Sequence, residues 1–311
     1  MKIVIAGGSG QLGALLARDF ARTGDEVVVL SRGSTSEARV VAWDATTLGP
    51  WSGELDGADV VLNLAGRTVD CRYTEANLAE MMRSRVDSTR VVGEAIALAE
   101  APPRLWLQMS TATIYAHRHD APNDEQNGVI GGAEPDAPAY WKRSIEIAQA
   151  WERTLDEART PHTRKVALRT AMVMSADAGG IFAVLRRMTR LGLGGAIGGG
   201  RQYVSWIHGD DFVRAIRFLI EHDELSGPVN LAAPSPLPQR DFMAALRSAG
   251  GTPFGLPAAK WMAEIGAFFL RTDTELLLKS RRVVPTRLVE AGFQFQHPTW
   301  PEAAQALVAA S

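Results

Sequence analysis

Short runs of apolar and β-branched residues alternate with longer helical patterns in the first half of the chain. The apolar runs fall at residues 2–6, 26–31, 39–43, 59–65, 104–110 and 165–174. Helical patterns lie between them, over about 11–24, 75–99 and 140–158. Strands that are apolar throughout and separated by helices are typical of a parallel sheet covered on both faces. The pattern predicts an α/β fold with a Rossmann-type, doubly wound parallel sheet.

The pattern changes after about residue 175. Glycine-rich loops, proline-rich connections and helices dominate, with strands expected near 203–207 and 228–232. We therefore divide the chain into a Rossmann domain over 1–175 and a smaller C-terminal substrate region over 176–311. Some strands and helices of the second part are expected to return to the first. The smaller region would lie over the carboxyl ends of the strands, where open α/β sheets bind ligands.

Composition narrows the class of partner. The chain has 311 residues, a formal net charge of -2 and a pI of about 6.3, so no strong field attracts it to nucleic acid or to an anionic membrane. Cys71 is the single cysteine, which excludes an internal disulfide and fits a reducing cytoplasm. His117 and His119 lack a third ligand at a recognisable spacing, and we expect no metal site.

The first apolar run is followed directly by "AGGSGQLG", residues 6–13. Gly7 would permit a tight turn, Gly10 would let the backbone approach a pyrophosphate, and Gly13 would let the helix pack close to the sheet. The amino end of the following helix favours phosphate charge. This strand–turn–helix context predicts a dinucleotide site, whereas the glycine spacing alone would also fit a structural turn.

The end of the second strand selects the dinucleotide. NAD-binding proteins usually place a carboxylate there to accept from the ribose hydroxyls. This chain has Ser31 and Arg32 instead. A hydroxyl and a guanidinium can bind a 2′-phosphate through charge-assisted hydrogen bonds. The pair predicts NADP(H) rather than NAD(H), unless Arg32 is only a solvated surface residue.

Two further strand ends are candidates for cofactor contact. Asp44 closes the third run and could accept from the adenine amino group, or it could cap the next turn. "NLAG" at 63–66 closes the fourth run with small residues. Ala65 and Gly66 would let the backbone lie against the ribose and phosphates.

Several motifs together resemble the extended short-chain dehydrogenase/reductase superfamily. They are the glycine turn, "NLAG", "STATIY", "GLGGAIGGGRQYVSWIHGDD" and "GPVNLAAPSP". Two stretches are more specific: the block that runs from "LGLGG" to "SWIH" over 191–208, and "LLLKSRRVVPTRLVEAGFQF". Both are similar to an atypical "epimerase family" branch that carries a C-terminal domain of unknown function. The resemblance implies cofactor contacts at Gly7, Gly8, Ser9, Gly10, Gln11, Leu12, Gly13, Ser31, Arg32, Leu64, Ala65, Glu80, Arg85 and the backbone near Val173. Without it, Arg85 would be an ordinary arginine on a helix surface.

The resemblance also implies a catalytic threonine and tyrosine. In that superfamily a tyrosine is the general acid/base, a lysine four residues later lowers its pKa, and a Ser or Thr at the end of the fifth strand polarises the substrate oxygen. Thr111 and Tyr140 match the threonine and tyrosine, but residue 144 is a serine. The nearby Lys142 points roughly 200° away from Tyr140 on a helix, so the usual pair is missing.

Three accounts of the proton chemistry stay open. Tyr140 packs at the helix start outside the site, or it acts as an acid with Arg143 or a cofactor hydroxyl, or another group replaces it. The candidates for replacement are Tyr115 and His208, although a structural histidine between strand and helix is the plainer interpretation of His208. Asp210 and Asp211 are expected to cap the helix that follows.

The segment over 190–208 is glycine-rich and ends in aromatic residues. A loop of this length in a compact domain is often functional, which favours a substrate lid over a plain connection. Tyr203 and Trp206 would then combine with Trp141 in an acceptor pocket. That pocket would suit a partly aromatic small molecule.

These observations favour one function and leave two alternatives. The leading prediction is an NADP-dependent oxidoreductase that acts on an unidentified carbonyl or alcohol. The missing tyrosine–lysine pair favours a non-catalytic NADP(H) sensor or regulatory protein, and the resemblance also allows a nucleotide-sugar epimerase-like enzyme. The helix over 75–99 is a candidate homodimer interface, although its apolar stripe would fit a core equally well.

Overall fold

Within the residues that the computed structural model describes (1–33, 38–135, 138, 140–259 and 275–311), seven parallel strands form the central sheet. The order of the strands is β10-β6-β5-β4-β1-β2-β3. Their bounds are β1 Lys2–Ala6, β2 Glu26–Ser31, β3 Arg39–Ala42, β4 Val60–Asn63, β5 Leu105–Thr111, β6 Arg164–Thr170 and β10 Gly227–Leu231. The predicted fold class is confirmed.

The winding of the sheet reverses between β1 and β4. From β1 the chain proceeds through β2 to β3, and from β4 it proceeds through β5 and β6 to β10 on the opposite side. Ala6 at the end of β1 lies beside Leu30 of β2 and Asn63 of β4. The carboxyl ends of these strands therefore meet at the switch point where open α/β sheets bind ligands.

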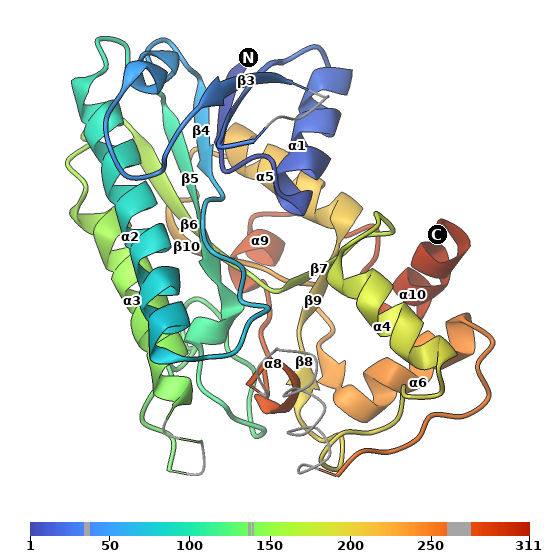
Figure 1. The fold of residues 1–311 in the computed structure, drawn as a ribbon. Coiled ribbons are helices and arrows are strands. Elements are labelled where there is room, and N and C mark those ends of the chain that lie inside the picture. The colour runs from blue at the N-terminus through green and yellow to red at the C-terminus, as the bar shows by residue number, and fades with distance from the viewer. Residues whose placement is uncertain (34–37, 136–137, 139, 260–274) are drawn as a thin grey trace.

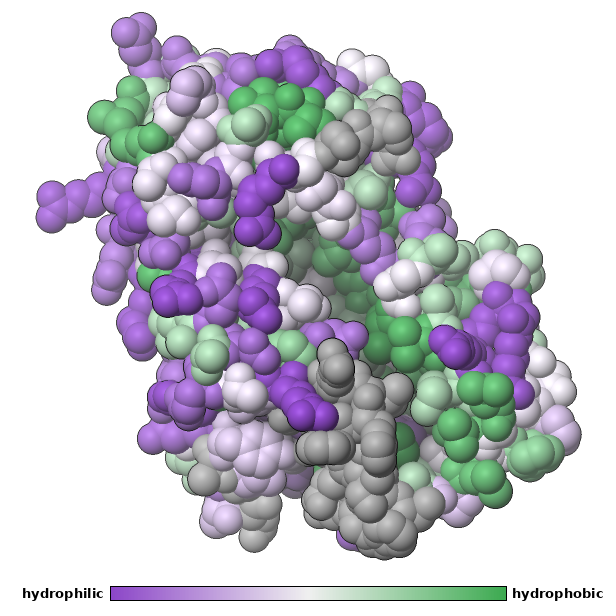
Figure 2. All heavy atoms as spheres, in the orientation of Figure 1, coloured by the Kyte–Doolittle hydropathy of each residue, from purple (hydrophilic) through white to green (hydrophobic). Residues whose placement is uncertain are grey.

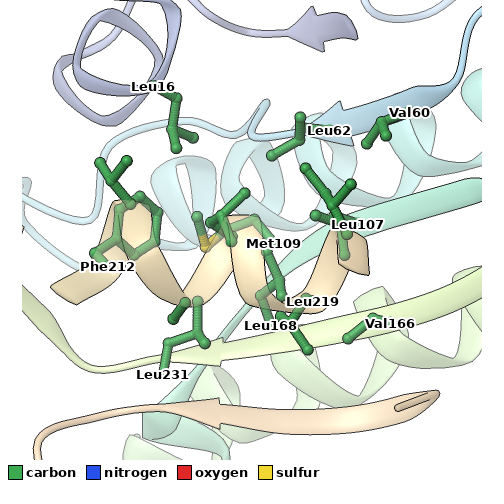
Figure 3. Close-up of a cluster of buried hydrophobic side chains, with 14 of the residues drawn as sticks. Leu16, Val60, Leu62, Leu107, Met109, Val166, Leu168, Phe212, Leu219 and Leu231 are labelled. Carbon is green, nitrogen blue, oxygen red and sulfur yellow. The ribbon is translucent and has the colours of Figure 1, made fainter. Parts of the chain in front are cut away.

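Alternate strand residues enter two different cores, because successive side chains of a strand point to opposite faces. Ile3 and Ile5 of β1 belong to one cluster, whereas Val4 and Ala6 belong to the other. Most of the helical residues in the first cluster come from α1 (Gln11–Arg22), α5 (Gly209–Glu221) and α9 (Thr286–Glu290), and one, Trp151, comes from α3 (Trp141–Glu157). Figure 3 shows Leu16 of α1 and Phe212 of α5 facing strand residues in this core.

The second core lies under α2 (Glu75–Leu98), α3 (Trp141–Glu157) and the short helix η1 (Pro50–Glu54). The hydroxyl of Thr74 accepts a hydrogen bond from the Asn77 amide and caps α2, which explains where this helix begins. α2 and α3 run side by side along one side of the sheet (Figure 1). A second short helix, η2 (Ala112–Ile114), directly follows β5.

The smaller region packs around its own apolar core. In this core the rings of Trp206 and Phe242 both contact the ring of Trp300, with centroids 5.0 and 4.0 Å away. Its helices are α4 (Ile181–Arg190), α6 (Gln239–Ala249) and α10 (Trp300–Ala309). Its strands are β7 (Met172–Met174), which pairs with β9 (Trp206–His208), and β8 (Tyr203–Val204), which pairs with β11 (Leu237–Pro238).

Two predicted strands differ from the structure. The run over 165–174 is two strands, because the chain leaves the main sheet at Ala171 and β7 pairs with β9 instead. The run over 203–207 is divided at Ser205, whose hydroxyl donates to the Arg281 carbonyl at 2.6 Å. The strand expected near 228–232 is β10, which lies in the main sheet beside β6.

Polar and apolar residues are distributed unevenly over the surface. Figure 2 shows hydrophilic residues over α2 and α3, hydrophobic residues gathered over the smaller region, and a hollow between the two parts. The exposed apolar side chains there include Val184 of α4 and Phe254. In the part of the chain that the structure describes, no helix has the length and apolar content needed to cross a membrane.

Candidate cofactor and substrate site

The turn after β1 requires glycine at two positions. Gly7 has φ of +74°, and a Cβ there would lie 2.8 Å from the Ala65 backbone. A Cβ on Gly13 would lie 2.3 Å from the Gly8 backbone, so no other residue allows α1 to approach the turn this closely. A Cβ on Gly10, in contrast, would meet only the Gly7 carbonyl at 3.9 Å. Open space at Gly10 is what a bound pyrophosphate would need.

The amino end of α1 offers hydrogen-bond donors to an anion. Gly10 is the N-cap and supplies no side-chain acceptor, and the first turn of the helix has no acidic residue. The amide nitrogen Nε2 of Gln11 is buried and has no hydrogen-bond partner. Unpaired donors at a helix amino end suit a phosphate group.

The end of β2 carries the two residues that predict the choice of dinucleotide. Ser31 is buried; its hydroxyl donates to Ser9 Oγ at 2.8 Å and accepts from the Gly33 amide at 3.0 Å. Arg32 is exposed, and no described carboxylate lies within ion-pair distance of it. The pKa of Glu80 on α2 is lowered, mainly by its hydrogen bond with Arg83 and partly by the charge of Arg32.

Asp44 organises the turn that follows β3. Its carboxylate accepts hydrogen bonds from the Thr46 and Thr47 amides at 2.8 and 2.9 Å and from the Thr47 hydroxyl at 2.6 Å. These bonds lower the pKa of Asp44 to about 2. The capping alternative accounts for this residue within the protein, while its contact with adenine stays a prediction.

The segment after β4 lies against the glycine turn and against α2. The Leu64 amide donates to the Ala6 carbonyl at 2.8 Å, and the Ala65 amide donates to Asn63 Oδ1 at 3.0 Å. A Cβ on Gly66 would lie 3.3 Å from the guanidinium carbon of Arg85. The structure thus places the residues that follow β4, which end at Gly66, beside Arg85 of α2.

Arg85 keeps its charge in a buried setting. Its guanidinium lies 4.9 Å from the Trp151 ring and donates to the Met81 carbonyl at 3.1 Å. Burial lowers the pKa of Arg85 to about 10. No carboxylate among the described residues forms an ion pair with it, so Arg85 is a cation available to a ligand.

The two predicted catalytic residues lie at the ends of their elements. Thr111 is the last residue of β5, and its hydroxyl accepts from the Thr113 amide at 3.1 Å. Tyr140 is the N-cap of α3 and is 41% exposed. Val173, the remaining predicted contact, is buried in β7 beside Ile207.

No lysine of α3 shares a face with Tyr140. Lys142 is exposed and lies 3.9 Å from Glu146. Arg143, the alternative partner of Tyr140, pairs with Glu75 of α2 at 3.0 Å and with Glu146 at 3.2 Å. Ser144, which stands where the superfamily has its lysine, donates to Glu275 Oε2 at 2.5 Å.

The two replacement candidates both have structural roles. Tyr115 is 1% exposed; its hydroxyl donates to Asn230 Oδ1 and accepts from Arg169, both at 2.9 Å. Burial raises its pKa, so Tyr115 is a poor proton donor for a ligand. Nδ1 of His208 accepts from the Asp210 amide and caps α5, as the structural interpretation predicts.

The expected capping roles of Asp210 and Asp211 are wrong. Both lie in the first turn of α5, after the His208 cap. Asp211 is fully buried and accepts from the Gln296 and His297 amides, both at 2.8 Å, so it anchors the C-terminal segment.

His208, Asp210 and His297 form a cluster that could attract a metal ion. The two rings stack with centroids 3.7 Å apart and an angle of 24° between their planes. Ring nitrogens hold their lone pairs in the ring plane, so nearly parallel rings do not direct them to one point between the rings. Because Nδ1 of His208 also accepts the Asp210 amide, this arrangement serves the helix cap.

The expected aromatic acceptor pocket does not form. Trp206 is fully buried and packs edge-on against Trp300. Tyr203 lies under the Arg282 guanidinium, 4.6 Å from its carbon. Trp141 alone of the three predicted aromatics lines a cavity. Sequence reasoning failed here because alternation along β8 and β9 does not reveal which face is covered.

That cavity has a volume of about 300 Å³ and lies at the start of α3. The residues around it are Gly132, Ala133, Glu134, Pro138, Trp141, Lys142, Ile145 and Lys279. Sequence reasoning missed Lys279 and its neighbour Glu275. The signal was a glutamate and a lysine four residues apart around apolar residues, a spacing that places both on one helix face.

Known proteins resemble this chain over nearly its full length. Residues 3–232 match the NAD dependent epimerase/dehydratase family, and residues 258–307 match a domain of unknown function, DUF1731. An epimerase family protein of Mycobacterium leprae, ML0860, is 33% identical over 97% of this chain and 94% of its own length. The Homo sapiens epimerase family protein SDR39U1 is 29% identical over 99% of this chain and 100% of its own length.

Solved structures resemble the fold closely. The crystal structure of human SDR39U1 (isoform 2) with NADPH has a TM-score of 0.85 and 26% identity, and the match covers 99% of each chain. A nucleoside-diphosphate sugar epimerase from Corynebacterium glutamicum has a TM-score of 0.77 and 26% identity, over 99% of this chain and 58% of that one. A Bacillus cereus UDP-N-acetylglucosamine 4-epimerase, at 16% identity and a TM-score of 0.70, shares the fold.

Proposed function

The chain belongs to the NAD dependent epimerase/dehydratase family, and on that premise we propose that it is an NADP-dependent oxidoreductase of the extended short-chain type. The family resemblance predicted from the motifs is thereby confirmed. The proposed substrate is a small molecule with a carbonyl or alcohol group. The observation that carries the choice of cofactor is Arg32, an exposed guanidinium with no described carboxylate partner at the end of β2. The NADPH in the human relative's structure supports the same choice.

The residues at the switch point fit a dinucleotide. Open space over Gly10, the unpaired Gln11 amide and the free amino end of α1 suit the pyrophosphate. Arg32 would hold the 2′-phosphate, and Arg85 would face the phosphates or ribose across the segment ending in Gly66. NADPH, when bound, supplies a hydride. Ser9, Leu12, Leu64 and the Val173 backbone would complete its walls.

Thr111 and Tyr140 are the proposed groups for the reacting oxygen. The Thr111 hydroxyl accepts from the Thr113 amide and therefore keeps its proton free to donate to a substrate oxygen. Tyr140 is exposed at the amino end of α3, where its hydroxyl is accessible to a ligand. This tyrosine would exchange a proton with the substrate.

A regulatory NADP(H) binder is the competing function. It is favoured by one observation: Ser144, in the place of the superfamily lysine, is engaged by Glu275 and leaves Tyr140 without a lysine on its own helix. Such a protein would bind NADPH tightly and would not oxidise it.

The deciding experiment measures NADPH oxidation by the purified protein across aldehydes, ketones, quinones and enones, with NADH in parallel. We expect turnover that prefers NADPH, and a loss of about 100-fold or more in Thr111→Ala and Tyr140→Phe. Thr23→Ala, at the far end of α1, is the control and should keep full activity. NADPH binding is measured for every variant by nucleotide fluorescence. Tight binding without turnover on the whole panel would favour the regulatory protein.

A further inference from the structure

The C-terminal region supplies a buried ion pair to the start of α3. Glu275 and Lys279 are one helical turn apart at the short helix α8 (Glu275–Leu278), with Nζ 3.3 Å from Oε1. Glu275 is fully buried and Lys279 is 2% exposed. Figure 1 places α8 between the lower end of the sheet and the smaller region. A buried pair is costly to desolvate and therefore needs further hydrogen bonds to hold it.

Those hydrogen bonds connect the pair to the end of β5 and to α3. Glu275 Oε2 accepts from Ser144, and Lys279 Nζ donates to the Thr113 carbonyl at 2.8 Å. Thr113 lies two residues after Thr111, so Lys279 is held beside the strand end that carries the proposed catalytic hydroxyl. An ammonium has three donors, and the third donor of Lys279 has no acceptor among the described residues.

The cavity at the start of α3 presents donors to its contents. Lys279 and Trp141 both line it, while the indole Nε1 of Trp141 is itself fully covered and has no hydrogen-bond partner among the described residues. Glu134 is the one carboxylate among the described lining residues, and its two oxygens accept from the His117 and Gly132 amides at 2.7 and 2.6 Å. The polar groups left without a partner are therefore donors, while Ile145 and Pro138 provide apolar wall.

We propose that this cavity is the acceptor-substrate site and that it binds a small molecule with a carboxylate or carbonyl oxygen on an apolar or aromatic body. The oxygen accepts from Lys279 Nζ, and the body packs on Ile145, Pro138 and the Trp141 ring. Lys279 then supplies from the C-terminal region the positive charge that residue 144 lacks. The role of this cavity as a substrate site rests on the proposed function, whereas the binding of a ligand there does not.

The volume and the charge both fit such a ligand. An apolar cavity of about 150 Å³ accepts benzene, so about 300 Å³ holds a substituted ring. The charged groups that face Lys279 are Glu275, Arg281 and Glu134. Burial, opposed by Glu275, lowers the pKa of Lys279 to about 8. The ammonium is present below pH 8 and is lost above it, so binding of a carboxylate should weaken as pH rises through 8.

The test uses the full-length protein with benzoate, acetophenone and toluene as probes, which share a ring and differ in the oxygen. Binding is measured by calorimetry and by tryptophan fluorescence, with and without NADPH. Lys279→Met would leave Glu275 buried without its partner, so the informative variant is Lys279→Met combined with Glu275→Gln. Lys2→Met, which removes a lysine of β1 that does not line the cavity, is the control.

We expect benzoate or acetophenone to bind, and the double variant to weaken that binding by about 10- to 100-fold, as for a charged hydrogen bond. Lys2→Met should change it less than threefold, and Trp141→Phe should abolish the fluorescence response. Tighter binding of benzoate, lost above pH 8, identifies carboxylate ligands; tighter binding of acetophenone identifies neutral carbonyl ligands.

The site would be overturned if toluene bound as tightly as the other probes, or if a folded double variant kept its affinity. Absence of binding by all three probes would also overturn it. The proposed function fails separately, if NADPH is never oxidised although the probes bind.

Discussion

Two arginines of the sheet–helix layer are buried in opposite electrostatic settings. Arg169 of β6 forms a two-pronged pair with Glu152, at 2.9 Å through Nε and 2.7 Å through Nη2. Burial alone would lower its pKa, but the hydrogen bonds and charge of Glu152 raise it above the usual range. Arg85 has only a carbonyl and a tryptophan ring, and its pKa is lowered. The first arginine holds the fold, and the second bears an unneutralised charge at the candidate cofactor site.

Replacing each arginine by methionine should therefore have opposite consequences. Arg169→Met leaves Glu152 buried without a counter-ion and should lower the free energy of unfolding by about 3–5 kcal/mol. Arg85→Met removes an unpaired charge and should change that free energy by less than about 1 kcal/mol, while weakening NADPH binding roughly 10-fold or more. Urea denaturation and fluorescence titration measure the two effects. Unchanged NADPH affinity in Arg85→Met would exclude this residue from the cofactor site.

At the scale of elements, one hydrogen-bond network fixes α3 on the sheet. Ser110 of β5 donates to Glu152 of α3 at 2.6 Å, and Arg169 of β6 bridges that carboxylate to the Tyr115 hydroxyl. The Tyr115 hydroxyl in turn donates a hydrogen bond to Oδ1 of Asn230 in β10. Three neighbouring strands and one helix are thus held in register by buried polar groups that satisfy one another.

Tyr115→Phe should break this network without touching the candidate site. The change leaves Asn230 Oδ1 and one Arg169 donor unsatisfied in a buried position, which costs about 1–3 kcal/mol of unfolding free energy. Tyr203→Phe is the matched control, because the Tyr203 hydroxyl has no described partner, and it should change stability by less than about 0.5 kcal/mol. Urea denaturation compares the two variants. A loss of NADPH turnover in a stable Tyr115→Phe protein would return Tyr115 to the list of proton donors.

At the scale of the whole molecule, the C-terminal segment joins both parts of the protein. The Ser280 amide donates to His117 Nδ1 in the loop after β5, and the Arg281 amide donates to the Tyr203 carbonyl in the smaller region. Phe293 then enters the core of the main sheet, and Trp300 enters the core of the smaller region. A chain that alternates between two cores in this way should make them unfold together.

Trp300→Ala tests that coupling. Removing this fully buried side chain should lower the free energy of unfolding by about 3–5 kcal/mol. Circular dichroism and the release of bound NADPH should report one shared transition at a lower temperature. Phe254→Ala, at a 62% exposed aromatic residue, is the control and should change stability by less than about 1 kcal/mol. Two separate transitions in Trp300→Ala would show that the smaller region unfolds by itself.

The sequence by itself determined the parallel sheet, the glycine turn and the placement of Arg32 at the end of β2. These features follow from local spacing. Apolar runs form buried strands, and glycine is required at positions 7 and 13 because the backbone of a nearby turn or of the neighbouring strand end approaches too closely for a Cβ. The missing lysine after Tyr140 was equally visible, because helical periodicity alone places Lys142 on the wrong face.

Only the tertiary structure decided the roles that depend on distant partners. Trp206 is core and Trp141 lines a cavity, although both are aromatic residues beside polar loops. Asp211 holds a segment that begins 85 positions later, and Ser144 meets Glu275 across 131 positions. Burial and pairing of this kind arise only when separate elements pack against one another. The local pattern around Ser144 therefore could not reveal that Lys279, from the C-terminal region, lies beside the end of β5.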